Sequence, residues 1–260
     1  MKTLAELRAE PHTSISRVRE FLICPKRHSL KYVDGAAPDF KPIALVLGSA
    51  WHAVVETWLA STTAPEDLKE QLRDHLKAEF TSADLPVLFD DPDDDEASFS
   101  DHAVKMLTAF LSRVRKPDRV IGVEVPFSLD VVHPKTGEVL SVPLVGALDA
   151  IVEEEDRVSL WELKTGAKKW GADQLDYDLQ IPAYSLVMRG RGHDRARLRL
   201  LITTKATLPV VQMVDVERSP ADEEELAELF FSVERAVTAG VDHRLRGWHC
   251  RSCPYAGPCR

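Results

Sequence analysis

Two charged side chains stand at the end of an otherwise apolar segment of the sequence. Residues 157–163 read RVSLWEL, and Glu162 and Lys164 lie two positions apart in this stretch. Because side chains alternate along a β-strand, the two would point to the same face. An acid beside an ammonium forms either a surface ion pair or half of a hydrolytic site, and taken alone the pair favours the surface ion pair.

A second acid makes the hydrolytic alternative more specific. Asp149 ends the segment GALD, with twelve residues between it and Glu162. If these segments are adjacent strands, the two carboxylates meet, and two like charges at close range need a cation between them. Carboxylate oxygens suit Mg²⁺ or Mn²⁺. Lys164 beside such a cation can hold or deprotonate an attacking water and stabilise negative charge at a phosphorus centre.

Three further polar residues complete an ordered set. His52, in the helical segment GSAWH, offers an imidazole ligand that shifts the metal preference toward Mn²⁺. Gln180 and Tyr184, in QIPAY, are four residues apart and share one face of a helix, from which they can contact the lysine or a phosphate. Each of these residues alone has an ordinary structural explanation. Their order along the chain is what makes the set specific.

This ordered set resembles the motifs of the RecB-like branch of the PD-(D/E)XK nuclease superfamily. That branch carries a helix histidine, G-x-x-D, [D/E]-x-K followed by T-G, and Q-x-x-x-Y, and the resemblance runs from about residue 14 to the C-terminus. It implies a metal-dependent DNA exonuclease acting on single strands or DNA ends, with partners among helicase, recombination or CRISPR adaptation proteins. By resemblance, the metal ligands are His52, Asp149, Glu162 and the carbonyl of Leu163, the catalytic lysine is Lys164, Gln180 and Tyr184 support the site and the DNA, and Glu124 is an extra acid near it.

Four cysteines form the other candidate site. Cys24 is solitary, whereas Cys250, Cys253 and Cys259 crowd the last eleven residues. In a reducing cytosol such clustering favours metal over disulfides. One Cys upstream with C-x₂-C-x₅-C downstream resembles the iron–sulfur subgroup of RecB-like nucleases, which includes CRISPR-associated exonucleases of type four and AddB-type subunits. The resemblance implies a [4Fe–4S] cluster that staples the chain ends, with Cys₄ zinc as the less favoured alternative.

The composition and net charge of the chain limit the functions that it can have. The net charge of −9 and pI near 5.5 argue against a broadly basic nucleic-acid-coating protein, but a bound metal ion can offset a locally acidic site in an enzyme acting on DNA. Basic and aromatic residues that could guide DNA, or form only a solvated surface, are Lys26, Arg27, His28, Lys168, Lys169, Trp170, Arg244, Arg246, Trp248, His249 and Arg251. We expect a soluble, cytoplasmic protein with no membrane segment. A subunit that binds DNA ends without cutting remains the alternative function.

Periodicity predicts the elements that must position these residues. The pattern gives a single domain, 1–260, of α/β class: a restriction-endonuclease-like mixed sheet flanked by helices. A helical section spans 14–115, an α/β catalytic core 119–217, and a closing helix with the cysteine cluster 219–260. The predicted helices are 14–33 with a break at Pro25, 44–60, 65–80, 97–115, 171–190 and 219–239, and the predicted strands are 119–132, 140–154, 157–163, 196–205 and 208–216.

Overall fold

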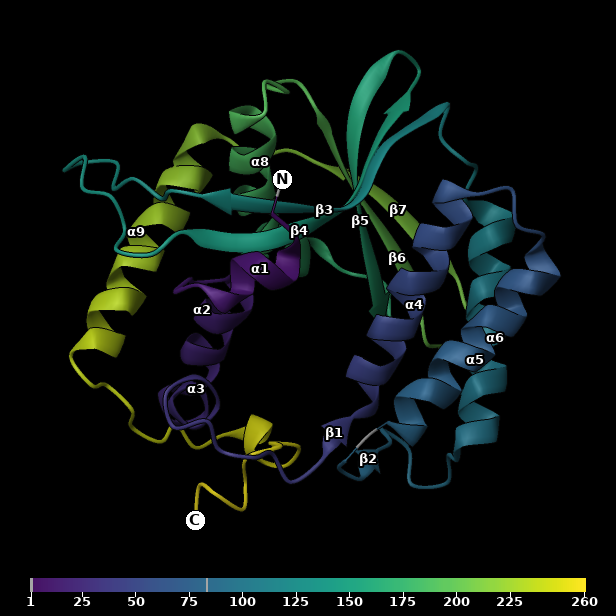
Figure 1. Cartoon of the computed structure of the whole chain (residues 1–260), viewed down its shortest axis with the longest axis horizontal. Coiled ribbons are helices and arrows are strands. Elements are labelled where there is room, and N and C mark those ends of the chain that lie inside the picture. The colour runs from purple at the N-terminus through teal and green to yellow at the C-terminus, as the bar shows by residue number, and fades with distance from the viewer. Residues whose placement is uncertain (1, 83) are drawn as a thin grey trace.

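A five-stranded mixed sheet lies at the centre of the structure, a computed structural model that describes residues 2–82 and 84–260 (Figure 1). Its strand order is β3-β4-β5-β6-β7, antiparallel except for the parallel pair β5 and β6. A parallel pair needs a crossover connection, and two helices between β5 and β6 supply it. The strands are β3 Arg119–Leu129, β4 Leu144–Glu154, β5 Arg157–Gly166, β6 Arg197–Thr204 and β7 Val211–Val216.

Helices cover both faces of this sheet and confirm the predicted mixed α/β class. Three of them, α4 to α6, pack on one face, while α2, α8 and α9 share a core on the other (Figure 1). A short parallel pair, β1 and β2, lies at the end of the α4–α6 group. The bounds are α1 Leu4–Ala9, α2 Ile15–Ile23, α3 Pro25–Tyr32, β1 Lys41–Pro42, α4 Ile43–Ala60, α5 Pro65–Thr81, β2 Val87–Leu88, α6 Glu96–Arg113, α7 Ala172–Asp176, α8 Gln180–Gly190, α9 Pro220–Thr238 and the 3₁₀ turn η1 Trp248–Cys250.

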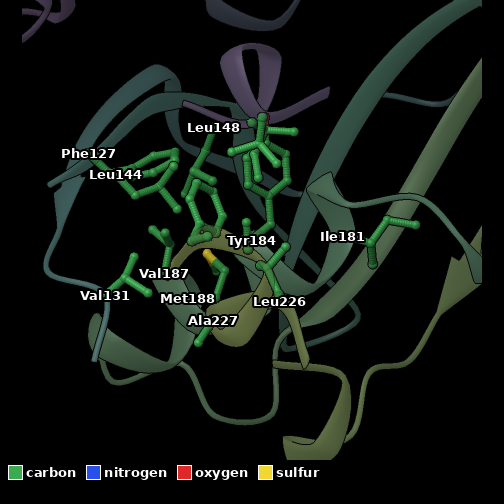
Figure 2. Close-up of a cluster of buried hydrophobic side chains, with 14 of the residues drawn as sticks. Phe127, Val131, Leu144, Leu148, Ile181, Tyr184, Val187, Met188, Leu226 and Ala227 are labelled. Atoms are coloured by element: carbon green, nitrogen blue, oxygen red, sulfur yellow. The ribbon is translucent and has the colours of Figure 1, made fainter. Parts of the chain in front are cut away.

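Alternation along β5 divides the hydrophobic residues between two cores. Trp161 and Leu163 belong to the core formed with α4–α6, whereas Leu160 belongs to the core shared with α8 and α9. Figure 2 shows part of the second core, where Leu148 and Tyr184 lie among apolar side chains of β3, β4, α8 and α9. Glu162 and Lys164, at the same alternation as Leu160, are thereby directed to the α8 side of the sheet.

The apolar composition of α4 is explained by its place in the first core. By length and composition this helix could cross a membrane, but half of it is buried within the domain. Val46, Leu47 and Trp51 are almost completely buried against neighbouring helices and the sheet. Burial in a domain core therefore accounts for the pattern.

The predicted helix 171–190 is wrong in its middle. The chain forms α7 and α8 instead, separated at 177–179. Asp178 accepts the backbone N–H groups of Gln180 and Ile181 through Oδ1, so its side chain begins a new helix at Gln180. The break matters because it places Gln180 in the first turn of α8, next to the sheet.

Three other elements, α1, β1 and β2, lie outside the predicted set. α1 begins with a capping box between Thr3 and Glu6, a local signal that precedes the predicted helical section. Strands β1 and β2 contain two residues each and carry no periodic pattern. The predicted strand 119–132 also ends earlier, at Leu129, and Val132 instead makes an isolated bridge to Val139 across the predicted turn.

Candidate active site

The two acids of the predicted site lie across from each other on adjacent strands. The antiparallel pairing of β4 and β5 reaches Ala150 opposite Trp161, and Asp149 and Glu162 are the next residues beyond this pair. Oδ2 of Asp149 accepts the backbone N–H of Leu163 at 2.7 Å, which fixes the carboxylate against β5. The sheet therefore brings the two carboxylates together from separate segments of the sequence.

Glu162 is buried and only half satisfied. Its Oε1 lies 2.5 Å from Nζ of Lys164, while its buried Oε2 accepts no hydrogen bond from any residue in the described parts of the chain. Burial raises the pKa of Glu162 to about 8, and the nearby charge of Asp149 adds to this effect against the opposing influence of Lys164. A buried carboxylate oxygen without a partner is costly unless a ligand supplies one.

Lys164 remains charged despite its surroundings. Burial disfavours the ammonium, but the Glu162 carboxylate outweighs burial and raises the pKa of Lys164 above its ordinary value. The side chain is therefore an ammonium in the absence of other ligands, held by carboxylates rather than poised as a neutral base. It can donate hydrogen bonds and offset negative charge.

His52 approaches the same carboxylate from α4. Its Nδ1 lies 3.4 Å from Oδ1 of Asp149. Burial opposes protonation, yet the Asp149 carboxylate outweighs it and raises the pKa of His52. For Asp149 itself, burial favours the neutral acid, but the neighbouring His52 holds the pKa below its usual range. Asp149 thus favours the protonated imidazole, which would lose its proton on ligating a metal.

The glutamine and tyrosine of Q-x-x-x-Y join the other motifs through one chain of hydrogen bonds. Nζ of Lys164 donates to Oε1 of Gln180 at 2.6 Å, and Nε2 of Gln180 donates to the hydroxyl of Tyr184. That hydroxyl donates in turn to the carbonyl of Ala147 at 3.0 Å, within the GALD segment. Burial raises the pKa of Tyr184 well above its ordinary value, so the hydroxyl keeps its proton and can donate.

The first residue of GALD, Gly146, must be small because it lies against the ring of Phe127, which packs against Tyr184. A Cβ at position 146 would come within 2.7 Å of the ring of Phe127. That ring stands edge-on to Tyr184, with centroids 6.2 Å apart, in the core shown in Figure 2. Gly146 therefore leaves room for Phe127, which in turn supports Tyr184. The sequence motif includes this glycine, but the packing that requires it is apparent only in the tertiary structure.

The donor set fits a hard divalent cation. Among residues 2–82 and 84–260, no three His, Cys, Asp or Glu side chains are already arranged to hold a metal ion. Asp149 nevertheless contacts both Glu162 and the His52 imidazole, and such oxygen and nitrogen donors suit Mg²⁺ or Mn²⁺. The residues present therefore agree in chemistry with the predicted cation.

A cleft of about 550 Å³ opens beside these groups. Two acidic residues that are not among the proposed metal ligands line this cleft: Glu56, one helical turn after His52, and Glu124 on β3. Burial, followed by repulsion from Glu124, raises the pKa of Glu56 to about 7. Glu124 has φ of 44°, a left-handed conformation that is uncommon for a residue other than glycine and clusters at functional sites. Glu56 lies outside the predicted site residues, although its spacing of four from His52 was a usable signal.

The four cysteines line one cavity of about 320 Å³. Cys24 is buried at the junction of α2 and α3, and Cys250, Cys253 and Cys259 approach it from the C-terminal segment. All four are free thiols. Burial raises the pKa of Cys253, which keeps it in the thiol form in this state. The topology thus brings together residues that are more than two hundred positions apart.

The tail is also tied to the N-terminal half by hydrogen bonds. The backbone N–H of Gly257 donates to Oδ2 of Asp39 at 2.7 Å, and the N–H of Asp39 donates to the carbonyl of Pro254 at 2.6 Å. Lys26 pairs with Asp242 at 2.8 Å. Figure 1 shows the C-terminal segment running from beneath α3 toward β1.

The basic residues suggested for DNA contact differ in their surroundings. Lys26 and Arg27 are ion-paired, with Asp242 and Glu20 respectively, and His28 is buried. In contrast, Trp248 is 83% exposed beside the cysteine cavity. DNA contact stays a prediction for both groups, and the ion pairs of Lys26 and Arg27 would compete with it.

This chain matches known proteins in family and in fold. The family model described as PD-(D/E)XK nuclease superfamily matches residues 12–260. A solved structure from Eubacterium rectale, provisionally described as an exonuclease, has a TM-score of 0.54 and 16% identity, covering 94% of this chain and 87% of that one. The structure of SSO0001 has a TM-score of 0.43 and 14% identity, covering 97% and 89%. No curated protein matched significantly. The match across nearly the whole sequence shows that this chain belongs to the PD-(D/E)XK nuclease superfamily.

Proposed function

We propose that this member of the superfamily is a metal-dependent DNA nuclease that hydrolyses phosphodiesters as an exonuclease on single strands or DNA ends. The single observation that carries the proposal is the meeting of Glu162 with Asp149 beside the Lys164 ammonium, with the buried Oε2 of Glu162 left without a hydrogen-bond partner among the described residues. In a purely structural ion pair, both buried carboxylate oxygens are normally hydrogen-bonded. A carboxylate that binds a cation keeps an oxygen available for that cation.

The proposed ligands are the side chains of His52, Asp149 and Glu162 with the carbonyl of Leu163. A Mg²⁺ or Mn²⁺ held by these residues would neutralise charge at the scissile phosphate and make water a better nucleophile. Lys164 orients the attacking water and offsets negative charge that develops on phosphorus. Gln180 holds the lysine in place, and Tyr184 holds Gln180 against β4, so both are positioning residues.

The preference for single strands or ends is supported by the resemblance of the motif set to the RecB-like branch. The similarity to the Eubacterium rectale protein points the same way. Any unwinding would come from a partner such as a helicase, recombination or CRISPR adaptation protein.

The cysteines are proposed to hold a structural [4Fe–4S] cluster in the RecB-like manner. Support comes from the convergence of all four thiols on one cavity and from the C-x₂-C-x₅-C spacing. When bound, a cluster would supply a cross-link between α3 and the tail, where hydrogen bonds from Lys26 and Asp39 already join the same segments. Equivalents of iron and acid-labile sulfide in anaerobically purified protein test this, and zinc without iron would contradict it.

Cleavage of an end-labelled oligonucleotide tests the proposed activity. Wild-type protein should degrade single-stranded DNA with Mn²⁺ or Mg²⁺ and remain inactive with EDTA. A circular single strand is the matched substrate without ends, and it should resist cleavage. Binding of DNA without any cleavage, by wild type and Lys164→Ala alike, would instead favour the non-cutting end-binding subunit.

A further inference from the structure

The wall of the cleft that faces the acids carries unpaired positive charge. The first of its cations, Arg17, comes from α2, and the second, Lys31, comes from α3. Arg8 on α1 lines the same wall. Across the described parts of the chain, none of these three cations forms an ion pair with a carboxylate.

The remaining cations of α2 and α3 provide an internal comparison. Arg19 pairs with Asp178 at 2.9 Å, Lys26 with Asp242 at 2.8 Å, and Arg27 with Glu20. None of these three lines the cleft. Among the five described cations of the two helices, the two that lack a carboxylate partner are therefore the two that face the cleft.

An aromatic ring orders these two cations. The guanidinium of Arg17 and the ammonium of Lys31 each lie 4.9 Å from the ring centroid of Tyr32, at cation–π distance. Arg17 also donates from Nη1 to the carbonyl of His12 at 2.7 Å, which limits the positions its guanidinium can take. The pair is thus held at the cleft without being neutralised.

The opposite wall carries the negative charge. Glu56, Glu124 and Asp149 line it from α4, β3 and β4, with His52 beside Asp149, and no ion pair crosses from these acids to the cations within the residues described. Opposite charges that share a cleft yet remain apart leave room for a group between them. A phosphodiester strand with a divalent cation meets both walls, because its phosphates face the basic residues and the cation faces the acids.

We propose that Arg17 and Lys31, ordered by Tyr32, bind the phosphate backbone of a single nucleic-acid strand next to the reacting phosphate. The inference rests on the proposed nuclease function and adds the residues that hold the substrate. Arg17 and Lys31 contact phosphate oxygens, whereas Tyr32 is a positioning residue that acts through them. Backbone contacts of this kind carry no base preference.

Salt-dependent binding tests the proposal without cleavage. The affinity of a labelled single-stranded oligonucleotide is measured in EDTA by fluorescence anisotropy across a range of KCl concentrations. Each lost phosphate contact should reduce the slope of log K against log salt by about 0.7. Arg17→Gln with Lys31→Gln should therefore lower the slope by about 1.4, and weaken binding by roughly tenfold per residue at low salt.

Matched controls come from unpaired, exposed cations of α6, outside the cleft. Arg113→Gln with Lys105→Gln removes the same charges and should leave affinity and slope close to wild type. Tyr32→Phe keeps the ring and should bind like wild type, whereas Tyr32→Leu should weaken binding. The exposed Lys31→Gln alone should fold normally and lower the slope by about 0.7. An unchanged slope in Lys31→Gln or in the double variant would overturn the proposal, as would an equal loss in the α6 control.

A small phosphodiester separates this inference from the proposed function. Bis(4-nitrophenyl) phosphate contains one phosphodiester and no extended backbone, so the cleft double variant should hydrolyse it at the wild-type rate with Mn²⁺ while degrading DNA poorly. Loss of both reactions would place the two cations in the chemistry itself and overturn the proposal. If wild-type protein cleaved neither substrate, the proposed nuclease function would fail, while the binding experiment would still decide the role of the basic wall.

Discussion

The ammonium of Lys164 lies 2.6 Å from the side-chain oxygen of Gln180, the residue that begins α8. Through this bond a strand residue takes its position from a helix on the same face of the sheet. Gln180→Leu should therefore lower DNA cleavage by about 10- to 100-fold with little change in DNA affinity, because loss of an orienting partner has effects of this size. Single-turnover rates with labelled DNA measure it. Tyr184→Phe, which removes only the hydroxyl one step further along the chain, should have the smaller effect, and the reverse order would contradict the proposed positioning chain.

Replacing either acid should abolish cleavage without unfolding the protein. Asp149→Asn and Glu162→Gln keep the side-chain volume but remove the charge that a divalent cation requires. We expect no detectable cleavage with Mn²⁺ and weaker Mn²⁺ binding by calorimetry. Circular dichroism should match wild type. Loss of the folded state in both variants would mean that the carboxylates are structural rather than catalytic.

Lys164→Ala should separate chemistry from metal binding. Removing a group that stabilises developing charge typically costs about 10²–10³-fold in rate. The variant should still bind Mn²⁺, since Asp149, Glu162 and His52 remain. Calorimetry with Mn²⁺ and cleavage assays on the same preparation measure both properties. Full cleavage activity in this variant would remove the lysine from the mechanism.

Glu56 should make the metal-free protein less stable as the pH rises. Its pKa is raised to about 7 in the folded state, against an ordinary value of 4.5, so the folded state binds the proton more tightly than the unfolded state. This contribution to stability is present below about pH 4.5 and is lost as the pH rises to about 7. In EDTA, Glu56→Gln should thus raise the melting temperature at pH 8 and change it little at pH 5.

The control for this pH dependence is Glu70→Gln, an exposed glutamate of α5 outside the cleft. It should leave the difference in melting temperature between pH 5 and pH 8 as in wild type. If Glu56→Gln behaved like this control, the carboxyl group would not be protonated near neutral pH in the folded state.

Gly146→Ala tests the packing reason for the glycine in GALD. The added Cβ would meet the Phe127 ring at 2.7 Å, and overpacking of this kind costs about 1–3 kcal/mol. The melting temperature should fall by about 2–4 °C per kcal/mol for a chain of this size. At Gly190, where a Cβ would meet no atom within 4 Å, the same replacement should be nearly neutral. Equal effects at both positions would contradict the packing argument.

Cys253→Ala should destabilise the anaerobically purified protein if the proposed cluster joins the chain ends. The four thiols line one cavity between α3 and the tail, so a shared ligand would cross-link segments distant in sequence. We expect loss of visible absorbance and iron together with a lower melting temperature. Unchanged melting with iron retained would argue against the staple.

The sequence by itself determined the class of this fold and most of its elements, because the spacing of apolar residues along a segment shows which side chains a helix or strand will bury. The strand 157–166 shows this, since Trp161 and Leu163 face one core and Leu160 the other. Residue type and order likewise indicated the acids, the lysine and the helix histidine before any strand register was known. The predicted helix 171–190 did not include the break before Gln180. That break depends on the side chain of Asp178 accepting two backbone N–H groups, and the spacing of apolar residues does not predict such a contact.

Only the tertiary structure decided which charges are paired and which are left without partners. Arg17 and Lys31 look no different in sequence from Arg19, yet Arg19 meets Asp178 while the other two face the cleft. The orphaned oxygen of Glu162 is likewise a property of the assembled sheet. The physical reason is that an ion pair or a desolvated oxygen depends on distances between segments remote along the chain, whereas the alternation of apolar and polar residues depends only on neighbours.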